Sequence, residues 1–299
     1  MTVLLYGRPP AAFDPPAKAL QTSPLIPGSA ALEEIAPGSA EAAVIYAPPG
    51  VLERRATLAL ALRALKPGGR IDAMAPKDKG GSRLRKELEG FGLTAHDEPK
   101  AHHRRCRATM DGPLTGLEAA IADGAGRIVP QTGLWSRPGV FAWDRIDAGT
   151  ARLAAVLPPL KGAGADLGCG AGALALAVLG SAAVTSLRLI DLDRRAIEAA
   201  RLNVTDPRAT FDWADARTLP AGGDLDFAVM NPPFHDGGQE DRRLGQGFVR
   251  KAADLLKKGG VLWMVANRHL PYEADLTAAF RRVGTVEESA GYKIFEAVK

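Results

Sequence analysis

The chain has 299 residues, of which 46% are hydrophobic and 24% are charged, a composition typical of folded globular proteins. Its length is about twice that of a common domain, so two domains are expected. The formal net charge of +4 permits a polyanionic partner without requiring one. Because the longest nearly apolar run, residues 171–184, is too short to span a bilayer and the first residues lack a signal-peptide pattern, we expect no membrane segment. The two cysteines, Cys106 and Cys169, predict no disulfide framework and fit a reducing cytoplasm.

Two segments of the first half recur in the second half. Ala43-Val-Ile-Tyr-Ala-Pro-Pro-Gly50 resembles Phe227-Ala-Val-Met-Asn-Pro-Pro-Phe234, and Leu65-Lys-Pro-Gly-Gly-Arg-Ile71 resembles Leu256-Lys-Lys-Gly-Gly-Val-Leu262. The matches occur in the same order, so we interpret them as a duplicated domain. The alternative is that Leu-Lys-Pro-Gly-Gly is only a common helix stop before a strand.

The two copies differ where chemistry would occur. The first copy has Ala47 where the second has Asn231, and Gly50 where the second has Phe234. It also has no glycine loop. We therefore expect residues 1–125 to form a smaller, degenerate domain that binds no cofactor, and residues 126–299 to form the catalytic domain. Residues 77–107 hold nine Lys/Arg against five Asp/Glu, which fits an RNA-facing surface and a solvated helix face equally well.

The second half alternates between strand and helix patterns. Buried-type strands are expected to end at Asp166 and to cover 187–190, 227–230 and 261–266, and helices are expected from Ala173 and over 194–203. Such alternation predicts an α/β fold with a doubly wound, mostly parallel sheet. Ligands of these sheets bind beyond the carboxyl ends of the strands, where the strand order switches.

A glycine loop and a later acid indicate nucleoside binding. Asp166-Leu-Gly168-Cys169-Gly170-Ala-Gly172 lies between a predicted strand and helix, and its glycines let the backbone approach a ligand closely. Asp191 follows at the end of the next strand, where its carboxylate can accept hydrogen bonds from ribose hydroxyls. The loop alone does not identify the cofactor, because Gly168, Gly170 and Ala173 also satisfy the dinucleotide fingerprint.

The tetrapeptide Asn231-Pro232-Pro233-Phe234 directly follows a predicted strand and favours one reaction. Its prolines rigidify the turn, so the Asn231 side chain and the Pro232 carbonyl can converge on one point. Two acceptors suit an exocyclic amine, whose nitrogen becomes more nucleophilic when both its N–H groups are bound. Catalysis is then alignment of that amine with a sulfonium methyl, and the Phe234 ring can stack on a base withdrawn from its helix. An isolated Asn-Pro-Pro-Phe would be read as a tight turn, but this position after the glycine loop favours the functional interpretation.

At this point the chain resembles the bacterial ribosomal RNA guanine-N2 methyltransferases, through the glycine loop, Asp191, residues 231–237, residues 265–272 and the segment 138–150. The resemblance implies a class I, Rossmann-like methyltransferase fold that uses S-adenosylmethionine on guanine in ribosomal RNA or an assembling ribosomal subunit. It also implies that Asp166 faces the methionyl amine and that Asp191, with Leu192 beside it, faces the ribose. Asp215 and the Ala216 N–H would face the adenine.

Other functions remain open from the residues alone. The same clamp would serve methylation of adenine N6 or of a protein glutamine amide. A nucleotide-dependent oxidoreductase would share the glycine loop but has no use for the clamp, and an inert RNA-binding module would not need an intact one. We expect no metal ion, because no complete ligand set occurs in the sequence, and a monomer is favoured over an oligomer.

Overall fold

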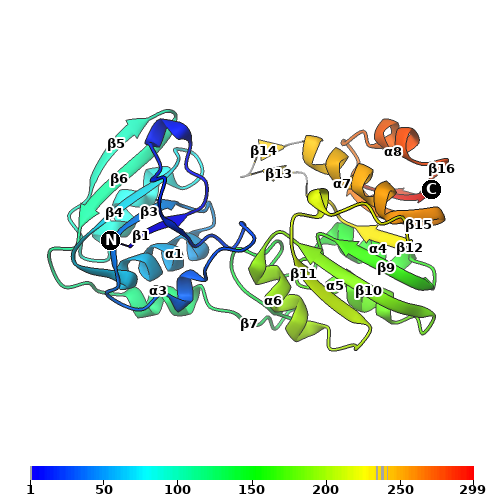
Figure 1. Ribbon diagram of the computed structural model, residues 1–299, viewed down its shortest axis with the longest axis horizontal. Coiled ribbons are helices and arrows are strands. Elements are labelled where there is room, and N and C mark those ends of the chain that lie inside the picture. The colour runs from blue at the N-terminus through cyan, green and yellow to red at the C-terminus, as the bar shows by residue number, and fades with distance from the viewer. Residues whose placement is uncertain (1, 234, 237–238, 241) are drawn as a thin grey trace. The chain divides into compact units, whose positions relative to one another are not determined.

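The computed structural model describes residues 2–233, 235–236, 239–240 and 242–299. It divides into two compact units, which Figure 1 draws in sequence colours. Unit 1 consists of residues 1–126 and 137–139, and unit 2 consists of residues 127–136 and 140–299. Within the described ranges, no helix is both long enough and apolar enough to cross a membrane.

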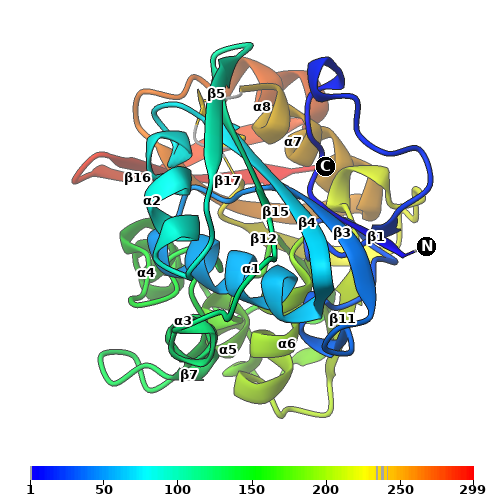
Figure 2. The same ribbon diagram turned by 90° about the vertical axis from the view of Figure 1, so that its left-hand side faces the viewer.

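Unit 1 is built on a six-stranded sheet with the strand order β2-β1-β3-β4-β6-β5. Its strands are β1 (Val3–Tyr6), β2 (Leu20–Gln21), β3 (Ala40–Tyr46), β4 (Leu65–Pro76), β5 (His96–Lys100) and β6 (His103–Thr109). Its helices are α1 (Val51–Ala64), α2 (Leu84–Glu89) and α3 (Leu117–Asp123), with short 3-10 turns at Ala11–Phe13, Leu32–Glu34 and Gly81–Arg83. Helix α1 packs on β3 and β4, and α3 packs on α1 (Figure 2).

Unit 2 is built on a seven-stranded sheet with the strand order β11-β10-β9-β12-β15-β17-β16. Its strands are β9 (Gly162–Leu167), β10 (Val184–Asp191), β11 (Ala209–Trp213), β12 (Leu225–Met230), β15 (Leu256–Asn267), β16 (Arg282–Ser289) and β17 (Tyr292–Val298). Its helices are α4 (Ala148–Val156), α5 (Ala173–Leu179), α6 (Arg194–Asn203), α7 (Arg242–Leu255) and α8 (Glu273–Ala279), with a 3-10 turn at Ala216–Thr218. Two small hairpins complete the unit: β7 (Arg127–Ile128) with β8 (Trp135–Ser136), and β13 (His235–Asp236) with β14 (Gln239–Glu240).

Helices cover both faces of the unit 2 sheet. Buried residues of α7 and α8 pack with one face, and buried residues of α4, α5 and α6 pack with the other (Figure 1). Strands β9, β10, β11, β12 and β15 pair in parallel, whereas β17 is antiparallel to both β15 and β16. The predicted doubly wound, mostly parallel sheet is therefore confirmed. The expected helix over residues 194–203 has the bounds of α6, and the antiparallel C-terminal hairpin was not foreseen.

The two sheets share their topology. The unit 1 order, read from β2 to β5, repeats the unit 2 order from β10 to β16, and unit 1 lacks only a counterpart of β11. The pairing of β3 with β4 is interrupted between Ala40 and Ala42. The pairing of the corresponding strands β12 and β15 is interrupted at the equivalent place, between Leu225 and Phe227. The related fold expected for the first domain is thus confirmed.

The repeated Leu-Lys-x-Gly-Gly segments have a common physical cause. Gly68 and Gly259 hold positive φ angles of 75° and 81° where α1 and α7 give way to strands, a conformation that favours glycine. A Cβ on Gly69 would lie 2.8 Å from the Lys66 carbonyl oxygen, and one on Gly260 would lie 2.9 Å from that of Leu225. The segment is therefore both part of the repeat and a helix stop.

A buried arginine occupies the degenerate loop of unit 1. Arg54 is fully buried, and its guanidinium donates two 2.8 Å hydrogen bonds to the Glu87 carboxylate. The same guanidinium donates to the carbonyl oxygens of Pro48 and Pro49, at 3.3 and 2.7 Å. The loop that corresponds to the Asn-Pro-Pro-Phe clamp therefore has its carbonyl groups bound within unit 1.

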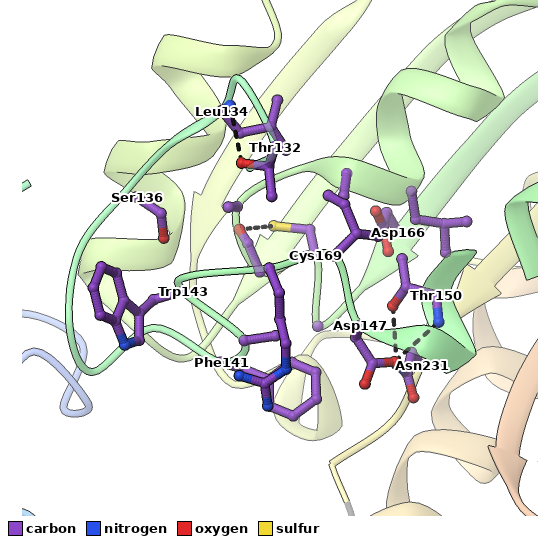
Figure 3. Close-up of a pocket in the computed structure, with 18 residues that line it drawn as sticks. Thr132, Leu134, Ser136, Phe141, Trp143, Asp147, Thr150, Asp166, Cys169 and Asn231 are labelled. Carbon is purple, nitrogen blue, oxygen red and sulfur yellow. Dashed lines mark hydrogen bonds between the residues drawn. The ribbon is translucent and has the colours of Figure 1, made fainter. Parts of the chain in front are cut away.

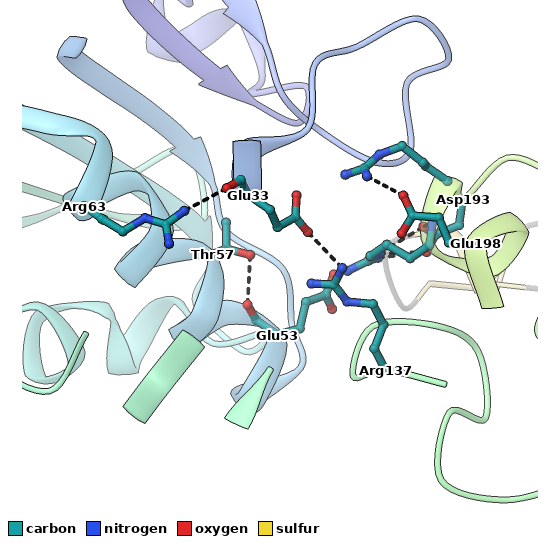
Figure 4. Close-up of polar contacts among 9 residues, drawn as sticks. Glu33, Glu53, Thr57, Arg63, Arg137, Asp193 and Glu198 are labelled. Atoms are coloured by element: carbon teal, nitrogen blue, oxygen red, sulfur yellow. Dashed lines mark hydrogen bonds and ion pairs between the residues drawn. The ribbon is translucent and has the colours of Figure 1, made fainter. Parts of the chain in front are cut away.

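Residues 137–139 belong to unit 1, and Arg137 makes a polar contact there. Arg137 forms a 2.9 Å ion pair with the side chain of Glu33, and the Glu33 carbonyl oxygen accepts a 2.8 Å hydrogen bond from Arg63 (Figure 4). In unit 2, Arg194 pairs with Glu198, and Arg195 pairs with Asp193 at the start of α6. Each of these contacts stabilises the unit in which it lies.

Removing the Glu87 carboxylate should destabilise unit 1 alone. Glu87→Ala leaves the buried Arg54 charge unpaired, which typically costs about 3–5 kcal/mol, whereas Glu87→Gln keeps one acceptor oxygen and most of the side-chain volume and should cost less. Hydrogen exchange of unit 1 amides would measure the loss. All four tryptophans lie in unit 2, so their fluorescence reports the unfolding of unit 2. A loss of unit 2 stability as large as the loss measured from the unit 1 amides would contradict the prediction.

Candidate active site

Three neighbouring parallel strands bring the predicted site residues to one edge of the unit 2 sheet. Strand β9 lies between β10 and β12, and Asp166 pairs in register with Leu189 and Val229. The glycine loop follows β9, Asp191 ends β10, and Asn231 follows β12. Because all three strands run in the same direction, their carboxyl ends form a common rim, as the fold class requires.

The glycine loop depends on glycine for its conformation. Gly168, Gly170 and Gly172 have positive φ angles of 79°, 53° and 88°, which side chains with a Cβ rarely adopt. Gly172 is also required by packing, since a Cβ there would lie 2.8 Å from a methyl group of Val204. A Cβ on Gly170 would meet nothing within 4 Å, because this residue faces the open pocket.

The Asn203 side chain forms hydrogen bonds with both the β7–β8 hairpin and the glycine loop. Its side-chain oxygen accepts from the Trp135 N–H at 2.7 Å, and its amide donates to the carbonyl oxygens of Trp135 and Ala171, each at 2.9 Å. The β7–β8 hairpin is thereby tied to the glycine loop. Thr132, Leu134 and Ser136 from this segment line the pocket, and Ser136 Oγ is buried without a hydrogen-bond partner among the described residues.

A pocket in unit 2 collects several of the predicted residues (Figure 3). Asp166, Gly168, Cys169, Gly170 and Asn231 line it. The segment after the hairpin supplies residues that the sequence analysis did not assign to the site: Phe141, Ala142, Trp143, Arg145, Ile146, Asp147 and Thr150. The pocket therefore combines acidic groups with aromatic surfaces.

Asp166 is a buried acid with one oxygen that has no hydrogen-bond partner among the described residues. It is 1% exposed, and its Oδ2 accepts no hydrogen bond from the described residues. Burial, with a smaller contribution from the negative charge of Asp191, raises the pKa of Asp166 from 3.8 to about 8. A cationic group placed beside this carboxylate would favour its ionised form.

Asp191 supports the glycine loop from the neighbouring strand. Its Oδ2 accepts from the Gly170 N–H at 2.9 Å, and its Oδ1 accepts from the Asp193 N–H at 2.8 Å. Burial raises the pKa of Asp191 to about 6, although these backbone hydrogen bonds act in the opposite direction. Asp191 does not itself line the pocket, so the structure gives it a loop-holding contact that the sequence did not predict.

Asn231 is held by the N-terminus of α4. Its Nδ2 donates to Asp147 Oδ1 at 2.8 Å and to Thr150 Oγ1 at 2.9 Å (Figure 3). Asp147 is also the N-cap of α4, because its Oδ1 accepts from the Thr150 N–H at 3.0 Å. Sequence reasoning missed Asp147 and Thr150 as site residues, although an acid three positions before a threonine is a recognisable capping signal.

The remaining predicted residues do not line this pocket. Both Asp215 oxygens accept from Arg217, at 2.9 and 2.7 Å. Ala216 is buried, and the Leu192 carbonyl oxygen accepts from the Trp213 indole at 2.9 Å. Pro232 is buried and Pro233 is exposed. Phe234 lies outside the described residues, so its predicted stacking role is a prediction still.

The residues present fit S-adenosylmethionine. Its ammonium and sulfonium groups are cations, and Asp166 offers a buried carboxylate without a hydrogen-bond donor among the described residues. Its adenine is a flat aromatic group, and Phe141 and Trp143 offer aromatic surfaces in the same pocket. Within the described part of the chain, no three His, Cys, Asp or Glu side chains gather where they could hold a metal ion.

Comparisons with known proteins identify relatives of this chain. Residues 131–296 match the family model described as Methyltransferase small domain. The ribosomal RNA small subunit methyltransferase C of Pseudomonas putida is 30% identical over 89% of this chain and 82% of its own length, and that of Shewanella pealeana is 32% identical over 80% and 72%. A solved T. thermophilus 16S rRNA N2 methyltransferase, in complex with AdoMet and guanosine, has a TM-score of 0.80 and 24% identity. The alignment covers all of this chain and 88% of that one, and the likeness supports the fold.

The buried acid should make unit 2 less stable as the pH rises. The pKa of Asp166 is about 8 in the folded chain against an ordinary 3.8. The folded chain therefore retains a proton that the unfolded chain releases, and the free energy of unfolding should fall by up to about 1.4 kcal/mol per pH unit between these values. Asp166→Asn should flatten this fall and be more stable than the parent at pH 8. Urea unfolding followed by tryptophan fluorescence at several pH values would measure it, and parallel pH profiles for the two proteins would refute it.

Proposed function

Since this chain belongs to the ribosomal RNA small subunit methyltransferase C family, we propose that it methylates the exocyclic N2 amine of a guanine in ribosomal RNA, with S-adenosylmethionine as the methyl donor. The observation that carries this proposal is the position of Asn231 in the same pocket as the unpartnered Asp166. An acceptor for an amine and a carboxylate for a cation are thereby brought together on one sheet edge.

The cofactor would be held by groups of the pocket. When bound, it supplies an electrophilic methyl group on a positively charged sulfur. We assign to Asp166 the contact with the methionyl amine, since this carboxylate has an unused buried oxygen. Gly168, Cys169, Gly170 and Gly172 allow the backbone to approach the ligand. We assign to Asp191 the ribose hydroxyls, because its two oxygens offer about four lone pairs and its backbone hydrogen bonds, from Gly170, Leu192 and Asp193, use no more than three.

The adenine contacts are proposed from the family resemblance. Asp215 would accept from the adenine amine, and the Ala216 N–H would donate to the ring. In the structure the Asp215 carboxylate accepts hydrogen bonds from the backbone N–H and the side chain of Arg217. Leu192 lies next to Asp191 in the chain and would contact the same nucleoside.

The reaction itself needs positioning more than proton transfer. Asn231 Oδ1 would accept from one N–H of the guanine amine, and the Pro232 carbonyl would accept from the other. These bonds keep the nitrogen lone pair directed at the methyl group, and this orientation accounts for most of the rate gain. After transfer the amine can release its proton to water, so no basic side chain is required. Pro233 fixes the turn, and Phe234 would stack on the extruded base.

We propose that unit 1 binds or supports the RNA without binding a cofactor. The basic stretch 77–107 is not uniformly available for this, because Arg105 is paired with Asp72, and Arg104 with Asp97. The hydrogen bonds that Arg105 donates to Asp72 raise the pKa of Arg105, so this guanidinium is already bound within unit 1. Arg83 and Lys86 are exposed, and they are better candidates for phosphate contacts.

Replacing Asn231 should separate binding from chemistry. Asn231 is also among the residues expected at the cofactor, but most of the proposed cofactor contacts lie on other residues. In Asn231→Ala, calorimetry with S-adenosylhomocysteine should therefore show most of the parent affinity. Single-turnover methyl transfer should fall by about 100-fold or more, since both alignment and amine polarisation are lost.

The substrate would be small ribosomal subunits from cells lacking the protein, and nucleoside mass spectrometry would identify the product. N2-methylguanosine is expected at one position. A gain of N6-methyladenosine alone, or label in protein alone, would remove the guanine assignment.

Neutralising the exposed cations should weaken RNA binding. The double variant Arg83→Ala with Lys86→Ala should raise the apparent Michaelis constant for RNA but not for S-adenosylmethionine. The salt slope of RNA binding should become shallower by up to about two, one for each lost phosphate contact. A slope equal to that of the parent protein would exclude this surface from the RNA interface.

A further inference from the structure

We propose that Asp147 and Thr150 are positioning residues, which fix the Asn231 amide so that Oδ1, and not Nδ2, is presented to the amine that is methylated. The inference rests on the proposed function, because it takes Asn231 as the group that binds this amine. It adds a second element, the N-terminus of α4, to a clamp that the sequence places wholly after β12.

An asparagine clamp has an orientation problem. The oxygen and the nitrogen of the amide have nearly the same shape, so rotation by about 180° exchanges an acceptor for a donor. An Asn231 rotated in this way would direct N–H groups at the N–H groups of the substrate. Two donors cannot form a hydrogen bond, so the reaction requires that one orientation be fixed before the base arrives.

The contacts of Asn231 resolve this problem. A carboxylate can only accept hydrogen bonds, so the group of Asn231 that lies 2.8 Å from Asp147 Oδ1 has to be Nδ2. Thr150 Oγ1 lies 2.9 Å from the same nitrogen. Two acceptors thus converge on an amide that has two protons. Both protons are used inside the protein, and Oδ1 is left as the group that can bind a substrate.

The two acceptors stand on a rigid support. Further along α4, Arg152 donates 2.7 Å hydrogen bonds to Glu287 Oε1 and to Ser289 Oγ, which anchor the helix to β16. Gly149 lies against the Tyr292 ring, where a Cβ would come within 2.9 Å of a ring carbon and 3.1 Å of Asp147 Oδ1. This close packing fixes the first turn of α4 relative to the sheet.

Helix capping alone does not account for this arrangement. An N-cap needs one acceptor for a backbone N–H, and Asp147 provides it to Thr150. The Thr150 hydroxyl has no part in that cap, yet it lies within hydrogen-bond distance of Asn231. Its contact with a residue 81 positions later in the chain serves the clamp.

The threonine hydroxyl can be removed with little other change. Thr150→Val keeps the side-chain shape and the capped backbone N–H, and Thr150→Ser keeps the hydroxyl. With the parent substrate, single-turnover methyl transfer by Thr150→Val should be slower by about tenfold, the typical effect of one hydrogen bond. Thr150→Ser should recover most of the rate. Affinity for S-adenosylhomocysteine and the midpoint of thermal unfolding should be nearly the same in both variants.

The carboxylate can be tested in the same way. Asp147→Ser retains a good N-cap residue, but its oxygen is one bond closer to the backbone and does not reach Nδ2. This variant should lose methyl transfer at unchanged cofactor affinity. A parent-like rate in both Thr150→Val and Asp147→Ser would overturn the proposal.

A readout that does not depend on activity is available because the chain has only three asparagines, Asn203, Asn231 and Asn267. Labelling asparagine side chains with nitrogen-15 would give three NH₂ signals, and Asn231→Ala would identify the one of interest. Exchange of its protons with water should be faster in Thr150→Val and return to the parent rate in Thr150→Ser. Equal exchange in the two variants would overturn the proposal.

The outcomes separate this inference from the proposed function. If the parent protein methylates adenine or protein instead of guanine, the guanine assignment is wrong, and the same variants test the orientation on the amine that is used. If the parent protein forms N2-methylguanosine and Thr150→Val matches Thr150→Ser in rate and exchange, the function stands and the positioning role is wrong.

Discussion

The parallel pairing of β9 with β10 on one side and with β12 on the other is the constraint from which the site follows. It places the end of each strand on one rim, so a loop, an acid and an amide from three distant stretches of sequence meet. The buried faces of these strands pack against helices on both sides, which leaves this rim as the place where polar groups can gather. The chemistry of the pocket is thus a consequence of strand order.

The two acids at this edge of the sheet reduce the stability of the fold. Asp166 and Asp191 are acids placed close enough for the charge of one to raise the pKa of the other, and Asp166 has an unsatisfied oxygen. A folded chain tolerates such an arrangement at a cost that a bound cation removes. The unfavourable burial of Asp166 is therefore itself an argument that a cationic ligand belongs there.

The parts of the fold and of the site that could be predicted are those that local sequence patterns determine. The glycine loop, Asp191 and Asn231 could be placed because short apolar runs identify strands and because the ends of parallel strands share an edge. The bounds of α6 were also predicted, and in the structure its N-cap Asp193 accepts from the Arg195 N–H. These features depend on neighbours within a few residues of each other.

The missing parts of the site depend on contacts between distant residues. Asp147 lies 84 positions before Asn231, and no local pattern indicates that a helix cap is shared with a clamp. The tie from Asn203 to Trp135 spans 68 positions, and the hidden partner of Arg54 lies 33 positions away. Such pairs become visible only when the packing of the sheet is known.

Arg54 makes the loop of unit 1 different from the Asn231 loop of unit 2, although the two sheets share a strand order. Restoring an asparagine at Ala47 would not recreate a clamp, because the Pro48 and Pro49 carbonyls are already bound by Arg54. Removing Arg54 would leave the Glu87 carboxylate without its arginine partner. A side chain at Gly80 would collide with the Arg54 guanidinium. An asparagine at position 47 would therefore need further substitutions around Arg54 before the Pro48 and Pro49 carbonyl groups could bind a ligand.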